Sequence, residues 1–463
     1  MSDYIDLFGN PQSFGDTETQ REVRANDRGY VFHSWSAQGA INPLPIAKGE
    51  GVRFWDYDGK EYLDFSSQLV NLNLGHQHPD LVRAIQDQAG RLATIQPSMG
   101  NDARGELAKR IVERSFDGAR SVFFTNGGAD ANEYAVRMAR HHTGRQKVLA
   151  RYRSYHGSTA TAITMTGEPR RWANGVLDPA VVHFEGPYLY RTAFHAETPE
   201  QETERALEHL ERTIVLEGAS TIAAIILETV TGTNGVLVPP PGYLPGVRAL
   251  CDKYGIVMIC DEVMVGFGRV GEWFAYQAFD VAPDLVTFAK GVNSGYVPLG
   301  GVVVSEAIHN TFVDRPFPGG LTYSGHPLAC ASGVVTFDVF ERDGILERVR
   351  DLGARIVEPR LAEMAAKHDS IGEYRGLGMF WSLDLVVDRA TREPLVPFNA
   401  AGDAAAPMNA VAAACKDAGL WPFVHFNRLQ IAPPLIIEEG DLVRGLDIID
   451  AALDVADGYY TGA

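Results

Sequence analysis

Cysteine is scarce in this chain, and neither a long apolar run nor a leader-like start is present. Four cysteines occur in 463 residues, and none forms a CxxC pair. We therefore expect the cysteines to be reduced and buried, and we expect no metal site. The four cysteines are Cys251, Cys260, Cys330 and Cys415. No apolar run is long enough to span a membrane, and MSDYIDLFGNPQ lacks the basic and apolar regions of a signal peptide. The sequence thus predicts a cytoplasmic protein without a membrane partner.

Positive charge is also in deficit, with 41 Lys and Arg against 59 Asp and Glu and a net charge of −18. This acidic balance argues against nucleic acid and anionic membranes as partners. It leaves room for a small anionic ligand, because a local group of N–H donors can bind one. The length suits one large domain and a smaller one, and the 45% of hydrophobic residues can fill their cores.

The pattern of the chain changes near residues 70 and 340. Residues 1–70 read as a polar, extended arm over residues 1–30, followed by a hairpin at 52–65 that joins the smaller domain. Residues 71–340 alternate helices with short apolar strands, which is typical of an α/β domain with a mainly parallel sheet covered by helices on both faces. Residues 341–463 alternate long amphipathic stretches with apolar segments, which indicates a smaller α+β domain.

Several segments of the middle region have clear periodicity. Three stretches carry apolar residues at helical spacing, namely 78–92, 104–116 and 129–142. Six short apolar runs are predicted strands, namely 121–125, 147–152, 221–228, 256–262, 285–290 and 300–305.

One strand-to-helix turn has the features of a phosphate cradle. In TNGGAD (Thr125 to Asp130), Gly127 and Gly128 allow close backbone approach, and the helix start offers free N–H groups with a positive dipole end. An ordinary turn with a glycine bend is the alternative. The turn lacks the Gly-Lys-Ser/Thr of a nucleoside-triphosphate loop. The other glycine-rich stretch, GFGRVG (266–271), matches a dinucleotide fingerprint by glycine count alone.

An acid and a lysine lie at the ends of two predicted strands, and they are the strongest candidates for catalytic residues. Asp261 ends one buried strand, and Lys290 ends another 29 positions later. A buried acid must find a partner, either in a structural salt bridge or in a protonated pyridine nitrogen that it stabilises. Burial would lower the pKa of Lys290 and provide a neutral amine nucleophile. Together the two side chains can hold a pyridine nitrogen and an aldehyde carbon, as amine chemistry on pyridoxal phosphate requires.

Two further segments offer contacts to a planar, phosphorylated cofactor. Tyr155 in SYHG follows a predicted strand and can stack on a ring, with His156 beside it. Both are equally typical of partly buried loop residues. Thr322 in LTYSGHPLACA has a hydroxyl that can reach a phosphate or cap the helix that follows.

Taken in order, the chain resembles the class III aminotransferases of pyridoxal-phosphate fold type I, and its pattern is closest to amine and ω-amino-acid:pyruvate transaminases. The resemblance covers most of residues 60–435. It is carried by TNGGADANEYAVRMAR, YRSYHG, ILETVTGTNGVLVPPPGYL, CDEVMVGFGRVGEWFA, FAKGV, LTYSGHPLACA and IAPPLII. It implies a large domain with a mainly parallel seven-stranded sheet, a smaller α+β domain, and a homodimer with shared active sites, or a tetramer.

The resemblance also implies a role for each matching residue. Lys290 would bind the cofactor covalently, and Asp261 would pair with its ring nitrogen. The remaining cofactor contacts would be Tyr155 and Val263 on the ring faces, Glu228 near the ring hydroxyl, His156, and Gly127, Gly128 and Ala129 at the phosphate, with Thr322 reaching the phosphate from the partner subunit.

Three positions depart from the family pattern. Ala129 replaces a hydroxyl residue that many members carry in the phosphate turn. Gln430 stands where ornithine- and 4-aminobutyrate-type enzymes have a carboxylate-binding arginine, and Phe423 stands near the mobile arginine of amine–pyruvate transaminases. Arg428 is the nearest candidate to bind a substrate carboxylate, although it also fits a solvated strand residue. The resemblance places the substrate pocket at Leu69, Val70, Tyr155, Thr233 and Phe423.

The sequence therefore predicts a ping-pong transaminase that moves an amino group from an amine or ω-amino acid to pyruvate or another small 2-oxo acid. Taurine, β-alanine, longer ω-amino acids and simple amines all remain open as donors. A lyase, decarboxylase or aminomutase of the same fold is the first alternative. A non-catalytic binding module is the second, although it would have no need of a proton-transferring lysine.

Overall fold

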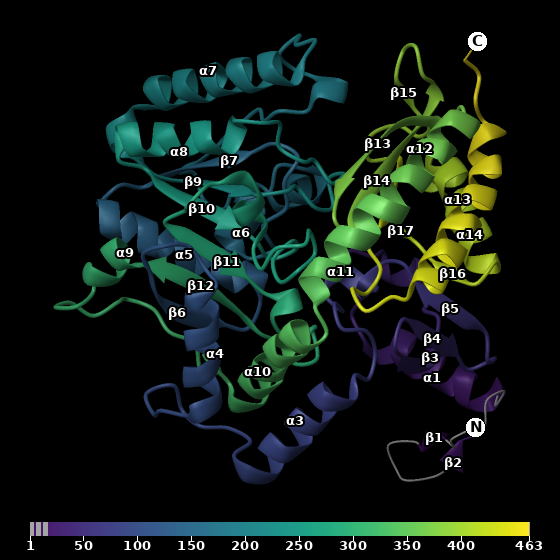
Figure 1. Ribbon diagram of the computed structural model, residues 1–463, viewed down its shortest axis with the longest axis horizontal. Coiled ribbons are helices and arrows are strands. Elements are labelled where there is room, and N and C mark those ends of the chain that lie inside the picture. Colours follow the sequence, from purple (N-terminus) through teal and green to yellow (C-terminus); the bar gives the residue numbers. More distant parts are fainter. Residues whose placement is uncertain (1–3, 6–10, 13–16, 463) are drawn as a thin grey trace.

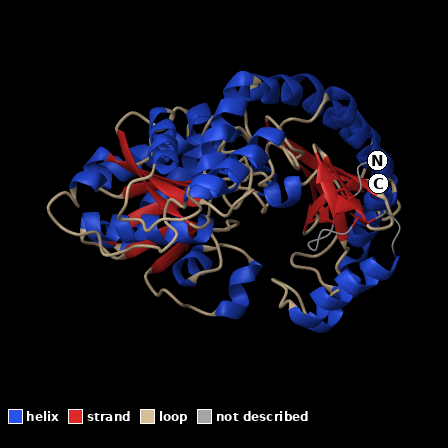
Figure 2. Cartoon of the chain, turned by 90° about the horizontal axis from the view of Figure 1, so that it is seen from below, coloured by secondary structure: helices blue, strands red, loops and turns tan. Residues whose placement is uncertain are grey.

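The computed structural model describes residues 4–5, 11–12 and 17–462 and consists of two parts (Figure 1). A larger part is built around a broad central sheet, and a smaller part carries the C-terminal helices and strands. Figure 2 shows that helices lie on both sides of the larger sheet and along the outer side of the smaller one. No helix in the described part of the chain is both long and apolar enough to cross a bilayer.

The central sheet has seven strands in the order β6-β12-β11-β10-β9-β7-β8. The strand β12 runs antiparallel to both of its neighbours, and the other four pairings are parallel. The seven-stranded, mainly parallel sheet is thus confirmed. The strands are β6 (Ala119–Thr125), β7 (Lys147–Arg151), β8 (Val181–Phe184), β9 (Ile222–Glu228), β10 (Val257–Asp261), β11 (Leu285–Phe288) and β12 (Gly300–Ser305).

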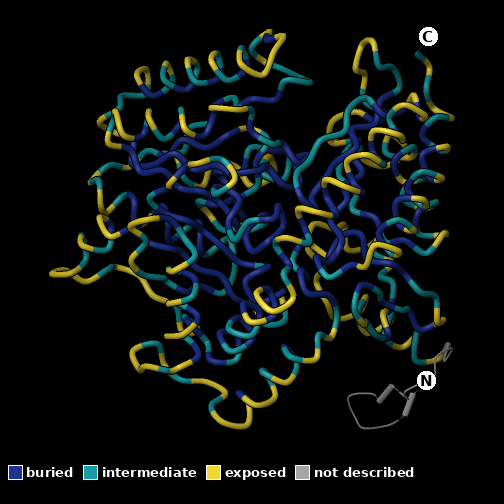
Figure 3. The backbone as a smooth tube through the Cα atoms, viewed as in Figure 1, coloured by how far each residue is buried: buried dark blue, intermediate teal, exposed yellow. Residues whose placement is uncertain are grey.

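Helices cover both faces of this sheet because successive side chains of each strand point to opposite faces and both sets are apolar. One face packs against α4 (Asp102–Glu113), α7 (Pro199–Glu217), α8 (Tyr243–Tyr254) and α10 (Pro327–Arg342). The other face packs against α5 (Gly128–Thr143), α6 (Ala160–Met165) and α9 (Glu306–Asn310). Figure 3 shows the strands as a buried centre and the outer helices as partly exposed. A further helix, α3 (Pro79–Arg91), lies along α10.

The smaller part has a sheet in the order β13-β14-β18-β17, with β15 paired to β14. Its strands are β13 (Ile371–Leu377), β14 (Phe380–Asp388), β15 (Glu393–Pro394), β17 (Phe423–His425) and β18 (Arg428–Ile431). Its helices are α11 (Ile345–Leu352), α12 (Glu358–Lys367), α13 (Ala406–Asp417) and α14 (Glu439–Asp457), with a single π turn at Gly353–Val357 joining the first two.

Part of the N-terminal region belongs to the same small body. The predicted hairpin is confirmed, since β4 (Arg53–Asp56) pairs antiparallel with β5 (Glu61–Asp64). The strand β5 also pairs with β16 (Leu420–Trp421), and β3 (Ile46–Glu50) pairs with β4. We propose domain divisions near residues 70 and 340, because the apolar cluster of the small part includes side chains from both ends of the chain.

The predicted extended arm is wrong over Thr17–Tyr30, which form the helix α1. This segment has few apolar residues, so no burial pattern marks it, but TETQREVRANDR is rich in residues of good helix propensity. Glu18 in the first turn and Arg28 in the last also favour the helix dipole. The preceding strands are β1 (Tyr4–Ile5) and β2 (Pro11–Gln12), and the rest of the arm lies outside the described residues.

Candidate active site

Three polar side chains meet at the carboxyl ends of β9, β10 and β11. Asp261 is paired in register with Glu228 on one side and Thr287 on the other. Residues in register share a face of the sheet, and these three lie on the face that α5 covers. The Thr287 hydroxyl donates to Asn132 Oδ1 of α5 (2.7 Å), and Asn132 Nδ2 donates to Asp261 Oδ2 (2.8 Å). The parallel register therefore sets two carboxylates side by side beneath a helix start.

Asp261 is only 3% exposed, and its carboxylate is held from several sides. Besides Asn132, the Val263 backbone N–H donates to Oδ1 (3.0 Å) and His156 Nδ1 lies 2.7 Å from Oδ2. These donors fix the carboxylate in one orientation and complement its negative charge. His156 Nε2 is buried and has no hydrogen-bond partner among the described residues.

Lys290 begins a short 3-10 turn, Lys290–Asn293, directly after β11. Its φ of 48° lies in the left-handed region, which is uncommon for a lysine and marks a sharp change of chain direction. Burial lowers the pKa of the Lys290 ammonium to about 8, although Glu228 and Asp261 favour its charged form. A substantial neutral fraction is therefore present near physiological pH, as a nucleophilic amine requires.

The Glu228 carboxylate accepts hydrogen bonds from the backbone of two loops that lie near this lysine. Its Oε1 accepts the Tyr155 backbone N–H (2.9 Å), and its Oε2 accepts the Gly232 N–H (2.8 Å). Burial raises the pKa of Glu228, and the charge of Asp261 adds to that effect. Glu228 thus fixes the loop that presents Tyr155, whose own pKa is raised by burial.

The predicted phosphate turn opens the helix α5. Gly127 is extended, with φ of −179°, and no side chain caps the helix start, which leaves its first N–H groups for an anion. A Cβ on Gly128 would lie 2.6 Å from a methyl group of Val263, so glycine is required for this close approach. Gly157 has φ of 128°, and a Cβ there would lie 2.5 Å from Ala129 Cβ, so the backbone at 157 packs closely on the small residue at 129.

These elements enclose a cavity of about 180 Å³. Most of the predicted cofactor contacts line it, together with Thr233 of the predicted substrate pocket. The lining residues are Gly128, Ala129, Asn132, Tyr155, His156, Gly157, Ser158, Glu228, Thr233, Asp261, Val263, Met264 and Lys290. The sequence did not point to Asn132, Ser158 or Met264. A polar residue on the otherwise apolar inner face of α5 was the available signal for Asn132.

Other predicted residues lie outside the cavity wall of the single chain. Thr322 is exposed in the loop before α10, where the resemblance assigns it to a partner subunit's site. Leu69 is 70% exposed, whereas Val70 is buried in an apolar cluster to which Phe423 and Met264 also belong. The segment α2 (Ser67–Val70) has positive φ at Ser67, Gln68 and Val70, so a tight, irregular turn positions this edge.

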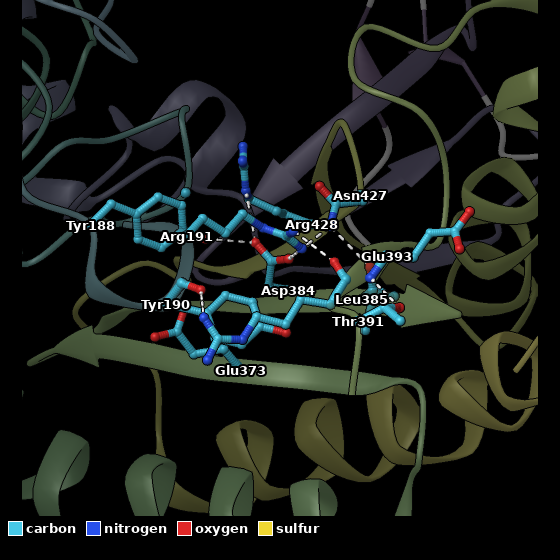
Figure 4. Close-up of polar contacts among 12 residues, drawn as sticks. Tyr188, Tyr190, Arg191, Glu373, Asp384, Leu385, Thr391, Glu393, Asn427 and Arg428 are labelled. Atoms are coloured by element: carbon cyan, nitrogen blue, oxygen red, sulfur yellow. Dashed lines mark hydrogen bonds and ion pairs between the residues drawn. The ribbon is translucent and has the colours of Figure 1, made fainter. Parts of the chain in front are cut away.

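Arg428 is bound to an acid of its own domain. Its guanidinium is buried, and Nε donates to Asp384 Oδ2 (3.2 Å) on the neighbouring strand β14. Figure 4 shows that Asp384 is also contacted by Arg191 Nη2 (2.8 Å), the Tyr188 hydroxyl (3.0 Å) and Asn427 Nδ2 (2.8 Å). The structure therefore places Arg428 in a network between the two parts of the molecule and not on the cavity wall.

Gln430 is also fully buried, and it acts on the cavity indirectly. Its Nε2 donates to the backbone carbonyl of Thr233 (3.0 Å), so the neutral amide braces a loop that lines the cavity. Gln430 and Phe423 are uncharged, and Arg428, whose Nη1 has no hydrogen-bond partner in the described part of the chain, is not among the residues that line the cavity.

Arg170, which sequence reasoning missed, does lie against the cavity wall. It belongs to the 3-10 helix η2 (Pro169–Asn174), and its guanidinium stacks 3.7 Å from the centre of the Tyr155 ring. Its Nη2 donates to Thr233 Oγ1 (2.9 Å) and its Nε to Glu168 Oε1 (2.5 Å). No motif marks this arginine, because η2 is a short loop element without periodicity.

Comparison with known proteins identifies the family. The family profile Aminotransferase class-III matches residues 35–453. The chain belongs to the class III aminotransferases. It is 34% identical over 455 residues to a taurine–pyruvate aminotransferase of Bilophila wadsworthia, covering 93% of this chain and 97% of that one. It is also 34% identical over 428 residues to a putrescine–pyruvate aminotransferase of Pseudomonas aeruginosa, covering 88% and 90%.

A solved class III structure extends the likeness to the fold. The taurine:2-oxoglutarate aminotransferase of Bifidobacterium kashiwanohense, in complex with PLP and glutamate, superposes with a TM-score of 0.91 at 44% identity, covering 95% of this chain and 98% of that one. The predicted fold type I architecture, aminotransferase activity and PLP cofactor are thereby confirmed.

The residues present in this aminotransferase fit PLP. The open start of α5 suits a phosphate, and the glycine at 128 leaves the space for it. The Asp261 carboxylate, which is fixed by hydrogen bonds, can pair with a protonated pyridine nitrogen. The Lys290 amine, whose pKa is lowered, can bond to an aldehyde carbon. All of these groups border one cavity.

Proposed function

We propose that this class III aminotransferase moves the amino group of an ω-amino acid or a related amine to pyruvate, or to another small 2-oxo acid. The observation that supports the proposed chemistry is that Lys290, Asp261 and Tyr155 line one cavity. The taurine- and putrescine-type relatives support a donor whose reacting carbon bears no carboxylate. Apolar Val70, Met264 and Phe423 near the cavity suit such a carbon.

Pyruvate is the preferred acceptor in this proposal because two positions that carry an arginine in related enzymes are uncharged in this chain. Gln430 and Phe423 are uncharged, and 2-oxoglutarate has a second carboxylate that a charged fork would have to bind. Pyruvate has a single carboxylate and makes no such demand. The Arg170 guanidinium, which lies against the cavity wall, can meet that demand, and one similar solved protein is a taurine:2-oxoglutarate aminotransferase, so the two acceptors must be compared directly.

In the proposed mechanism the protein residues position groups and move protons. PLP supplies an aldehyde for the amino group and a conjugated ring that accepts the electrons released at the substrate carbon. Lys290 would hold the cofactor, and its Nζ, once free, would be placed to take the proton from the donor carbon. Asp261 would favour a positive charge on the ring nitrogen, and Tyr155 and Val263, which line the same cavity, would contact the ring.

We also propose that two copies of the chain complete two sites. Thr322 is exposed and lies away from the cavity of its own chain, which supports a contact to the phosphate of a partner subunit's cofactor. Analytical ultracentrifugation would test the assembly, and a sedimenting monomer with full activity would contradict it.

The function is tested with a panel of amines, each assayed with pyruvate and with 2-oxoglutarate. We expect alanine to form from ω-amino acids faster than glutamate does, with ping-pong kinetics. Release of product without any acceptor would instead indicate a lyase or decarboxylase. The lysine is tested separately, because borohydride should fix the cofactor to the peptide that contains Lys290. Attachment elsewhere would overturn the assignment of that residue.

A further inference from the structure

We propose that Arg170 is the receptor for the acidic group of an ω-amino acid donor. This inference rests on the proposed function and names the residue that selects its substrate. The guanidinium contacts two residues of the cavity wall, since it stacks on Tyr155 and bonds to the Thr233 hydroxyl. It is also close enough to Lys290 to help lower the pKa of that lysine. Its positive charge therefore contributes to the electrostatic potential inside the cavity.

The contacts of Arg170 leave part of its guanidinium for a ligand. Nε is occupied by Glu168 and one hydrogen of Nη2 by Thr233, but no hydrogen bond from Nη1 is found among the described residues. The side chain is 23% exposed, so protein atoms do not seal it off completely. A guanidinium presents five N–H donors in a planar fork, and its Nη1 and Nη2 can bind a carboxylate or sulfonate together.

Aromatic rings surround this cation. Besides Tyr155, the Trp35 ring lies 5.9 Å from the Arg170 guanidinium, and the rings of Trp35 and Tyr155 lie 6.4 Å apart, edge to face. The stacking restricts the planar group to a few orientations and displaces water from its faces. An anion approaching the remaining edge therefore meets a pre-oriented donor pair, which reduces the entropy lost on binding.

Glu168 gives Arg170 a partner when no acid is bound. Its carboxylate is 1% exposed, and its Oε2 lies 3.7 Å from Nε2 of His425. Burial raises the pKa of Glu168, but His425 and Arg170 together hold it below its usual value. Glu168 Oε2 has no hydrogen-bond partner in the described part of the chain, so the Arg170 Nε contact to Oε1 must persist when Nη1 and Nη2 bind an acid. An amine without an acidic group would leave the Arg170–Glu168 pair intact.

The test compares donors that differ only in the acid. The wild-type holoenzyme and the variants Arg170→Gln, Arg170→Lys and Arg171→Gln are assayed with β-alanine, taurine and propylamine at saturating pyruvate. For Arg170→Gln we expect KM for the two acids to rise about 10- to 100-fold, the range of one charge-assisted contact, with kcat changed less than about 3-fold. Propylamine should keep its kcat/KM, and Arg170→Lys should recover part of the loss. Arg171→Gln removes the same charge one residue away and should behave as wild type.

A binding measurement separates this inference from the proposed function. Propionate and ethanesulfonate carry the acid without the amine, and calorimetry of the holoenzyme gives their Kd. Arg170→Gln should weaken both at least about 10-fold, even if none of the three donors turns over in the wild type, in which case the proposed function fails alone. Equal losses for propylamine and the acids, an equal effect of Arg171→Gln, or unchanged anion binding would overturn the role of Arg170.

Discussion

The Nδ1 atom of His156 lies 2.7 Å from Oδ2 of Asp261, and both side chains are buried. The two residues come from different strand ends, 105 positions apart in the chain. His156 also lines the cavity, and we propose that it positions Asp261, the acid assigned to the cofactor nitrogen. Its backbone carbonyl accepts from Asn132, whose amide bonds to the same carboxylate oxygen.

We expect a substitution of Asp261 to lower the activity more than a substitution of its partner His156. Asp261→Asn should lower kcat/KM about 100-fold or more while the protein still binds PLP, because a neutral amide no longer favours the charged ring. His156→Gln should cost about 10-fold, since Asn132 and Val263 still hold the acid. Steady-state assays with the best donor give both values. An Asp261→Asn enzyme with wild-type activity would remove this acid from the mechanism.

The lowered pKa of Lys290 predicts how apoenzyme recaptures PLP as pH changes. The neutral amine is the form that attacks the aldehyde, so the second-order rate should rise about 10-fold per pH unit below pH 8 and level off above it. A lysine of ordinary pKa would give a rate that still rises at pH 9.5. Stopped-flow absorbance measures the rate. Because Glu228 raises the pKa of Lys290, Glu228→Gln should move the midpoint to lower pH.

The phosphate turn offers a comparison of two adjacent glycines. Gly128→Ala should weaken PLP binding about 10-fold or more, because its Cβ meets Val263 at 2.6 Å and displaces the helix start. Gly127→Ala should bind PLP nearly as wild type, since its backbone is extended and its Cβ would meet nothing within 4 Å. Titration of apoenzyme with PLP gives the affinities. Because Val263 also lines the cavity, Val263→Ala alone is the reference for the double variant. Gly128→Ala should cost little affinity in that background, and an undiminished cost would contradict the steric explanation.

The Asp384 network predicts a pH-dependent loss of stability. Burial raises the pKa of Asp384, but Arg375, Arg428 and Arg191 outweigh it and hold that pKa below its usual range. Asp384→Asn should therefore lower the free energy of unfolding by about 3 kcal/mol near pH 7, since it leaves buried guanidinium groups without a counter-charge.

The sign of the pH effect follows from the lowered pKa of Asp384. Its contribution is complete above the unfolded pKa of about 4 and is lost as pH falls further, because only the unfolded chain then takes up the proton. Urea unfolding at pH 7 and pH 3.5 should thus show a difference between wild type and variant that shrinks at the lower pH. Asp417→Asn, at an 86% exposed acid, is the control and should change little. A constant difference at both pH values would contradict the ion-pair explanation.

Much of the fold follows from periodicity in the sequence. Six strands of the central sheet were predicted from apolar runs, and the helices α3, α4 and α5 from helical spacing. The seventh strand, β8, was missed because VVHF is too short to form a pattern. The helix α1 was missed for the opposite reason, because a mostly exposed helix has no apolar stripe to reveal it.

The sequence analysis assigned the acid of the site to Asp261, and the structure shows why its neighbour Glu262 does not share the cavity. Asp261 and Glu262 are consecutive, and strand alternation sends them to opposite faces. Asp261 faces α5 and the cavity, whereas Glu262 is fully buried on the other side and accepts the backbone N–H groups of Ala275 and Tyr276. Burial raises the pKa of Glu262 to about 7, so a buried acid with a shifted pKa is not by itself a cavity residue.

The sequence by itself determined the class of chemistry, because a lysine and an acid at two strand ends and a glycine turn before a helix are local features. Tertiary structure alone decided which cation stands beside the cavity. Arg428 was the nearest carboxylate-binding candidate in the sequence, but folding brings Asp384 against it. Arg170 had no distinguishing neighbours in the sequence, but folding sets it on Tyr155 and Thr233. The charge that an arginine can offer to a ligand depends on the groups packed around it, and those come from distant parts of the chain.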